Sequence, residues 1–125
     1  MSAAESPSAD AIGVVGVGWV GLVTAACFAS LGHRVWAMDV DERKVERLSG
    51  GDVSFHEPGL AELVRDHGDK LEFTTSMDEL LANTKLLFCC VDTPPTYSGD
   101  ADLSRVQAVV SQLPEGDDSH ALVMK

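Results

Sequence analysis

The chain has 125 residues, of which 20 are Asp or Glu and 9 are Lys or Arg, so its formal net charge is -11. This length suffices for one hydrophobic core and is too short for two ordinary domains. The acidic charge argues against nucleic acid or an anionic membrane surface as a partner, because both would repel the chain. We therefore expect one globular domain over residues 11–125, preceded by a flexible leader at residues 1–10.

The first predicted elements are a buried strand over residues 11–17, a glycine-rich turn and a helix that continues to residue 31. A phosphate could approach the backbone of this turn closely, because Gly16 and Gly18 have no side chains to block it. The N-terminus of the helix would offer unpaired N–H groups to the phosphate, and Gly21 would let the helix lie close to the strand. The turn therefore predicts a dinucleotide site formed by Gly16, Val17, Gly18, Trp19, Val20 and Gly21.

A second strand is predicted over residues 34–40, and Asp39 lies near its carboxyl end. The acid follows the glycine turn by about 20 positions, the spacing expected of a residue that binds a ribose. A carboxylate there accepts hydrogen bonds from ribose hydroxyls and repels a 2′-phosphate. We therefore expect NAD as the cofactor rather than NADP.

A membrane or secretory role is an alternative interpretation of the uncharged stretch over residues 11–32, because about 20 apolar residues can span a bilayer. The stretch contains several glycines, and no Lys or Arg precedes it, which argues against both a membrane helix and a signal peptide. We expect a cytoplasmic protein in which Cys27, Cys89 and Cys90 are reduced and buried. The cysteines and histidines have no metal-ligand spacing, so no metal site is predicted.

The remainder of the chain alternates between helical and extended patterns. Asp102 is expected to cap the last helix, and Ser76 with Glu79 has the spacing of a capping box. The predicted helices cover residues 41–48, 60–67, 76–82 and 103–113, and the further strands cover residues 71–74, 86–91 and 121–124.

Such alternation predicts an α/β protein of the Rossmann type, a doubly wound parallel sheet with strand order 3-2-1-4-5. In this order the first and fourth strands are neighbours at the point where the winding reverses. The glycine turn and the loop at Thr93 would then flank one crevice, which makes Thr93 a candidate cofactor contact. A plain turn residue before Pro94 is the alternative interpretation of Thr93.

These motifs resemble the N-terminal NAD-binding domain of the UDP-glucose/GDP-mannose 6-dehydrogenase family. The resemblance runs from Ile12 to Lys125 and includes the glycine turn, Glu57-Pro58-Gly59-Leu60, and Thr93-Pro94 followed by Ala101-Asp102-Leu103. It implies oxidation of the primary alcohol of a nucleotide sugar to a carboxylate, with two hydride transfers to NAD through intermediates on a cysteine. It also implies that Val20, Asp39, Lys44 and Thr93 contact NAD, with Lys44 beside the adenosine ribose.

The sequence departs from the family pattern at several positions. Trp19 stands where the family commonly has Tyr, and Asp92 places an acid where a small or amide residue is more usual, so its charge is expected to weaken NAD binding. None of the three cysteines matches the motif of the catalytic cysteine, so no catalytic residue is assigned. We interpret the chain as a truncated domain that binds NAD without catalysis, the nucleotide sugar being a partner of the full-length enzyme alone.

Two other functions fit the sequence. One is the NAD-binding domain of a hydroxyacid-type dehydrogenase, although the turn beginning at Glu57 and the loop at Thr93 argue against it. The other is a non-catalytic module that senses NAD or binds a partner. The open edge of the predicted fifth strand also favours self-association into a homo-oligomer. The nucleotide sugar stays open among UDP-glucose, UDP-N-acetyl sugars and GDP-mannose.

Overall fold

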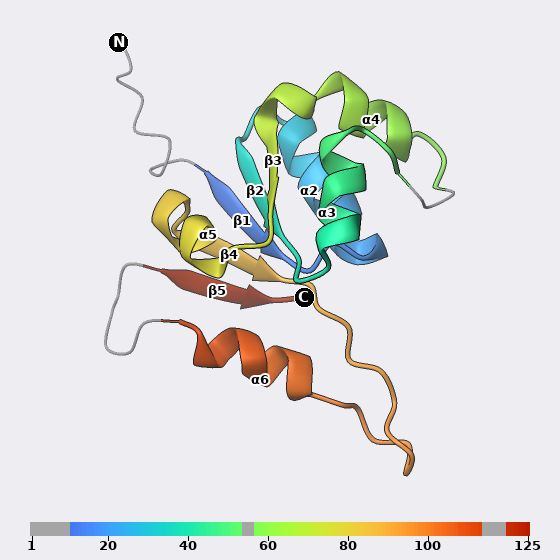
Figure 1. The fold of residues 1–125 in the computed structure, drawn as a ribbon, viewed down its shortest axis with the longest axis vertical. Coiled ribbons are helices and arrows are strands. Elements are labelled where there is room, and N and C mark those ends of the chain that lie inside the picture. Colours follow the sequence, from blue (N-terminus) through green and yellow to red (C-terminus); the bar gives the residue numbers. More distant parts are fainter. Residues whose placement is uncertain (1–10, 54–56, 114–119) are drawn as a thin grey trace.

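Five parallel strands form the centre of the domain in the computed structural model, which describes residues 11–53, 57–113 and 120–125 (Figure 1). The sheet order is β3-β2-β1-β4-β5, which confirms the predicted fold class and strand order. The expected leader, residues 1–10, lies outside the described residues. The strands are β1 (Ile12–Val15), β2 (Val35–Met38), β3 (Leu71–Thr74), β4 (Leu86–Cys89) and β5 (Ala121–Met124).

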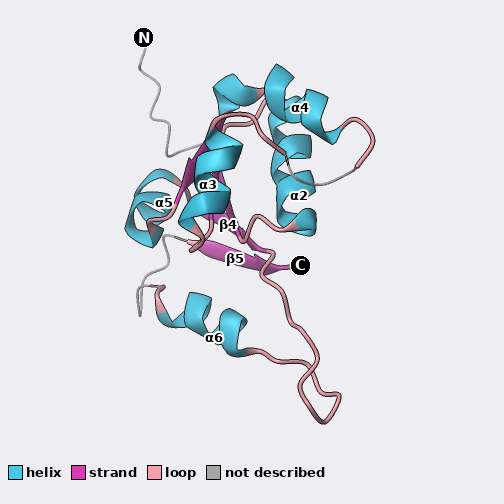
Figure 2. Ribbon diagram, turned by 45° about the vertical axis from the view of Figure 1, so that its right-hand side comes forward, coloured by secondary structure: helices cyan, strands magenta, loops and turns pink. Residues whose placement is uncertain are grey.

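The helices cover both faces of this sheet, as a doubly wound fold requires. The helices α2, α3 and α4 lie on one face, and α5 and α6 lie on the other (Figures 1 and 2). A 3₁₀ turn, Gly68–Lys70, links α4 to β3. The α-helices are α2 (Trp19–Ser30), α3 (Glu42–Ser49), α4 (Leu60–Asp66), α5 (Met77–Asn83) and α6 (Ser104–Ser111).

The hydrophobic core is divided into two layers by the sheet, because successive residues of a strand point to opposite faces. Val14 packs with α2 in one layer, and Val15 packs with α5 and α6 in the other. The adjacent cysteines follow the same rule: Cys90 belongs to the first layer and Cys89 to the second. Burial on both faces explains why the central strands are apolar throughout.

The point where the winding reverses lies between β1 and β4. These strands pair in parallel with Ile12 opposite Leu86 and Val15 opposite Cys89. Their carboxyl ends therefore open side by side, and the chain leaves β1 toward α2 on one face while it leaves β4 toward α6 on the other. This divergence creates the crevice in which ligands bind to open α/β sheets.

Two helix N-termini differ from the sequence-based expectation. Leu103, not Asp102, occupies the cap position of α6, although an Asp102 carboxylate oxygen accepts the N–H of Ser104 at 2.9 Å and thereby lowers the pKa of Asp102. The Ser76 hydroxyl caps α5 by accepting the N–H of Glu79 at 3.1 Å. The Glu79 carboxylate accepts the hydroxyl of Thr74 and is thus drawn away from the N–H of Ser76 that a complete capping box would use.

The burial of Cys27 was predicted wrongly, because its side chain is exposed on α2. The face of α2 that packs on the sheet is made of Leu22, Ala25, Ala26 and Ala29. Cys27 lies off that face, and the apolar composition of the whole helix conceals the difference in the sequence. Within residues 11–53, 57–113 and 120–125, no helix combines the length and the apolarity needed to cross a bilayer.

Candidate functional site

The turn between β1 and α2 contains two glycines, Gly16 and Gly21, that the fold itself requires. Gly16 has a φ of +94°, a conformation that residues with a side chain rarely adopt, and a β-carbon there would lie 3.0 Å from the carbonyl oxygen of Cys90. A β-carbon at Gly21 would overlap the carbonyl oxygen of Gly16. The first turn of α2 can therefore pack directly against the end of β1.

Gly18 differs from these two glycines, because no described residue lies close enough to require a glycine there. Its φ of −70° suits any residue, and the nearest atom to an added β-carbon is an Asp92 carboxylate oxygen at 3.9 Å. Gly18 is the N-cap of α2, which has no side-chain cap and no acid in its first turn. The first N–H groups of a helix have no carbonyl partner within the helix, so those at the start of α2 are available to an anion.

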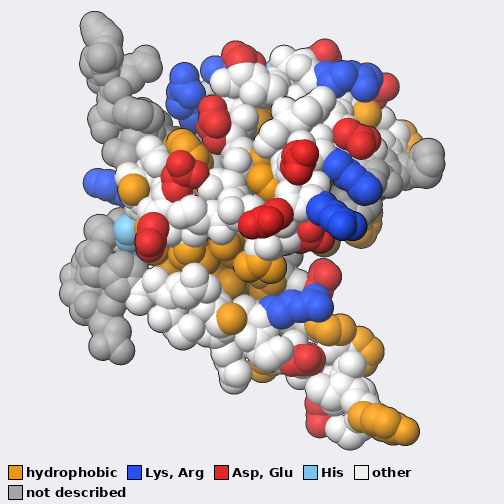
Figure 3. Space-filling view, in the orientation of Figure 1, with side chains coloured by type: hydrophobic (Ala, Val, Ile, Leu, Met, Phe, Trp, Pro, Cys, Tyr) orange, Lys and Arg blue, Asp and Glu red, His pale blue; other side chains and the backbone are white. Residues whose placement is uncertain are grey.

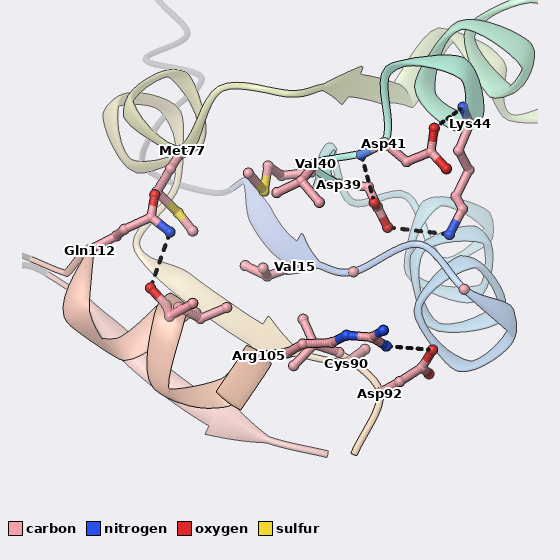
Figure 4. Close-up of a pocket in the computed structure, with 16 residues that line it drawn as sticks. Val15, Asp39, Val40, Asp41, Lys44, Met77, Cys90, Asp92, Arg105 and Gln112 are labelled. Carbon is pink, nitrogen blue, oxygen red and sulfur yellow. Dashed lines mark hydrogen bonds and ion pairs between the residues drawn. The ribbon is translucent and has the colours of Figure 1, made fainter. Parts of the chain in front are cut away.

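Asp39 joins the glycine turn to the start of α3. One carboxylate oxygen accepts the N–H of Val17 at 3.0 Å. The other accepts the N–H of Asp41 at 3.0 Å, a hydrogen bond drawn in Figure 4. The ammonium of Lys44 lies 3.6 Å from the first of these oxygens. Asp41 caps α3 by accepting the N–H groups of Arg43 and Lys44, so the helix start places Lys44 beside Asp39.

A cavity of about 450 Å³ opens in front of the glycine turn, at the carboxyl ends of β1, β2 and β4. Gly16, Gly18, Asp39 and Lys44 line it, so the structure brings four of the residues predicted from the sequence together. Figure 4 shows the charged side chains of Asp39, Lys44, Asp92 and Arg105 toward one end of the cavity and Met77 and Gln112 toward the other.

The other predicted residues do not line the cavity. Val17 is fully buried, and Gly21 is buried against the turn. Trp19 and Val20 are exposed on the first turn of α2, and Thr93 is exposed in the loop after β4. Trp19 donates its indole N–H to a carboxylate oxygen of Glu57 at 2.7 Å, which connects the glycine turn to the Glu57-Pro58-Gly59-Leu60 turn before α4.

One side of the cavity was missed by sequence reasoning. It consists of the face of α6 that carries Arg105, Ala108 and Val109, of Gln112 directly after that helix, and of Met77 at the start of α5. The helical spacing of the α6 residues is visible in the sequence and marks them as one face of a helix. That this face turns toward the glycine turn depends on the docking of α6, where Val109 is the buried residue. Figure 3 shows hydrophobic side chains gathered between α6 and the rest of the domain.

The cavity is nearly balanced in charge. Asp39, Asp41 and Asp92 face Lys44 and Arg105 around it. Cys90 is the one cysteine in the lining, and burial raises the pKa of its thiol, while a hydrogen bond with Thr24 opposes the shift. Burial thus keeps the thiol protonated and poorly nucleophilic. Among the described residues, no group of three potential metal ligands comes together.

These residues fit a dinucleotide. The space in front of Gly18 and the N–H groups of α2 suit a pyrophosphate, and Asp39 with Lys44 suits the hydroxyls of a ribose. The apolar side chains of Met77 and Val109 suit a flat aromatic ring.

Comparison with known proteins supports this interpretation. The sequence pattern of the UDP-glucose/GDP-mannose dehydrogenase family, NAD binding domain, matches residues 10–125. The chain is 47% identical over 102 residues to a UDP-glucose 6-dehydrogenase of Pseudomonas aeruginosa, a match that covers 80% of this chain and 22% of that protein. It is 44% identical over 119 residues to a UDP-glucose 6-dehydrogenase of Haloferax volcanii, covering 91% of this chain and 27% of that protein.

The fold also matches a solved structure. A ternary complex of GDP-mannose dehydrogenase from Pseudomonas aeruginosa superposes with a TM-score of 0.84 at 30% sequence identity, covering 90% of this chain and 27% of that one. The chain therefore spans about a quarter of the length of these relatives. Together with the family pattern and the glycine turn, these matches show that the chain belongs to the UDP-glucose/GDP-mannose dehydrogenase family and corresponds to its NAD-binding domain.

Proposed function

We propose that this chain holds NAD for a nucleotide-sugar 6-dehydrogenase of the UDP-glucose type, which oxidises a primary alcohol to a carboxylate. The observation that carries the proposal is the glycine at position 18. The fold leaves room for a side chain there, and the same space lies at the uncapped N-terminus of α2, in the cavity that Asp39 and Lys44 also line. A bound pyrophosphate explains why that space is kept free. The substrate class is supported by the relatives at 47% and 44% identity, which are UDP-glucose 6-dehydrogenases.

The positions of the residues support the roles that we propose for them. The N–H groups at Gly18, Trp19 and Val20 hold the pyrophosphate, and Asp39 accepts ribose hydroxyls while Lys44 balances its charge. Thr93 lies outside the cavity lining, in the exposed loop after β4, and its contact with the cofactor is proposed from the family resemblance alone. When bound, NAD supplies the ring that accepts the hydride. Asp39 disfavours NADP, because its carboxylate would repel a 2′-phosphate.

We propose that the chain alone binds NAD but does not turn over. Oxidation of an alcohol to a carboxylate removes four electrons, so it requires two molecules of NAD and a group that holds the intermediate aldehyde oxidation state. Cys90 lines the cavity, but its buried thiol with a raised pKa is unsuited to that task. The sugar-binding and covalent steps are thus assigned to parts of the enzyme beyond this domain, in keeping with its share of the relatives' length.

A cytoplasmic location is part of the proposal. Cys27, Cys89 and Cys90 are all free thiols, and Cys27 is exposed. Reducing compartments keep such thiols unpaired. Fractionation of cells that produce the protein tests this point, and recovery in an oxidising compartment would contradict it.

The binding proposal is tested by calorimetric titration of the chain with NAD and with NADP, using wild type and Gly18→Ala. Wild type should bind NAD at least about tenfold more tightly than NADP, and Gly18→Ala should lose about tenfold or more in NAD affinity because its methyl group occupies the phosphate space. Gly68→Ala is the matched control, since an added β-carbon at Gly68 would have no described atom within 4 Å. A folded wild-type chain that binds no NAD would refute the proposal.

A further inference from the structure

An ion pair bridges the two elements that flank the cavity near the glycine turn. Arg105 Nη1 lies 3.4 Å from Asp92 Oδ2, with Asp92 just after β4 and Arg105 in the first turn of α6. Figure 4 shows Arg105 extending toward Asp92, and both residues line the cavity. The pair is largely exposed, so packing alone does not dictate it.

Asp92 lies close to the space that a phosphate would occupy. Its Oδ1 is the nearest atom to a β-carbon built on Gly18, at 3.9 Å. A carboxylate so near to a pyrophosphate opposes its binding. Two like charges about 5 Å apart in water change a binding constant about fourfold, and more where water is partly excluded. An unbalanced Asp92 would therefore weaken a dinucleotide site at Gly18.

We propose that Arg105 sets the affinity for NAD by neutralising Asp92 beside the pyrophosphate, so that the two residues form a charge-balanced part of the cofactor site. The proposal rests on the proposed function, in which the turn at Gly18 holds the phosphates. In this proposal Arg105 is a positioning residue that changes the affinity for NAD through Asp92. It also accounts for an acid at position 92, because the acid and its counter-charge are present together.

A purely structural role for the pair makes a different prediction. Val109 is the one residue of α6 that is buried, so the ion pair could serve only to tie the helix to β4. If the pair had only this structural role, substitution of Asp92 and substitution of Arg105 would change NAD affinity in the same direction. In contrast, charge balance requires opposite effects, because removal of the acid leaves a free cation and removal of the cation leaves a free acid.

The test is calorimetric titration of the chain with NAD, using wild type, Asp92→Asn, Arg105→Gln and the double variant. Asp92→Asn should bind about fourfold more tightly and Arg105→Gln about fourfold more weakly, whereas the double variant should lie within about twofold of wild type. The differences should shrink when salt is raised from about 0.05 to about 0.5 M. The affinities of the four chains for ADP-ribose, which keeps the pyrophosphate, should follow the same order. Their affinities for adenosine, which lacks phosphate, should not differ.

Matched controls remove a single charge elsewhere on the domain. Asp66→Asn on α4 and Arg34→Gln at the amino end of β2 should each stay within about twofold of wild type. Weaker NAD binding by both Asp92→Asn and Arg105→Gln would show that the ion pair has only a structural role and would overturn the inference. An Arg105→Gln chain with wild-type NAD affinity would overturn it as well. A folded wild-type chain without NAD affinity would instead refute the proposed function, so the two failures are distinguishable.

Discussion

A carboxylate oxygen of Asp39 accepts the N–H of Val17 at 3.0 Å, which ties the end of β2 to the glycine turn that follows β1. The other oxygen accepts the N–H of Asp41 ahead of α3. The acid expected to bind a ribose is thus already oriented by the backbone of two other segments. The position of the Asp39 carboxylate and the conformation of the glycine turn therefore depend on each other.

Asp39→Asn should therefore affect both stability and binding. An amide has one acceptor oxygen, so either Val17 or Asp41 loses a partner for its N–H, at a cost of about 1–2 kcal/mol in the free energy of unfolding. The preference for NAD over NADP should also narrow, since the negative charge is gone. Urea denaturation and paired titrations measure the two effects. Asp66→Asn should leave both unchanged, and an Asp39→Asn chain with wild-type stability would show that these bonds contribute little.

Gly21→Ala should destabilise the fold rather than merely weaken binding. The added methyl group overlaps the carbonyl oxygen of Gly16, so α2 must move away from β1. Overpacking of this kind costs about 1–3 kcal/mol or more. Thermal unfolding of Gly21→Ala beside Gly18→Ala measures the contrast, because Gly18→Ala should unfold within a few degrees of wild type. Equal losses of stability in the two variants would contradict the distinct roles of these glycines.

Asp41→Ala should weaken the start of α3. Asp41 accepts the N–H groups of Arg43 and Lys44, at 3.1 and 3.3 Å, and loss of such a cap costs about 1 kcal/mol. Fraying of the first turn would also loosen Lys44 beside Asp39, so NAD affinity should fall by a few fold. Glu46→Ala, at an exposed position of the same helix, is the control for helix composition. A stability change no larger than that of the control would argue against the capping role.

The three cysteines should differ in reactivity. Iodoacetamide should label Cys27 in the folded chain and spare Cys89 and Cys90, which are buried. Burial raises the pKa of Cys90, so its protonated form stabilises the fold at neutral pH, and this contribution is lost as pH rises through the raised pKa. Mass spectrometry of the labelled peptides, at pH 7 and above, measures the order in which the three cysteines react with iodoacetamide. Labelling of Cys90 before Cys27 would contradict it.

Much of the architecture could be predicted from the sequence because local rules and topology agree. Strands apolar on both faces, such as the one ending at Cys89, and short connections require a parallel sheet with right-handed crossovers. Gly16 and Gly21 mark the turn since only glycine suits their conformation and contacts. The position of Asp39 follows from its place at the end of the second strand.

The missing parts of the site depend on how the helices dock. The burial of Cys27 was misjudged because every turn of α2 is apolar, so composition does not show which face meets the sheet. Arg105 looks like any charged residue of an exposed helix, and Asp92 looks like an isolated unfavourable acid. Their pairing at 3.4 Å becomes visible only when α6 is placed beside the end of β4.

The sequence by itself thus determined the α/β fold, the strand order, the glycine turn and the acid at its side, because these depend on backbone conformation and on periodic burial. The tertiary structure alone decided which charges meet around the cavity. Side chains such as Asp92 and Arg105 come from segments separated by a loop whose course no local pattern specifies. The balance of charge around this cavity is therefore a property of the packed domain.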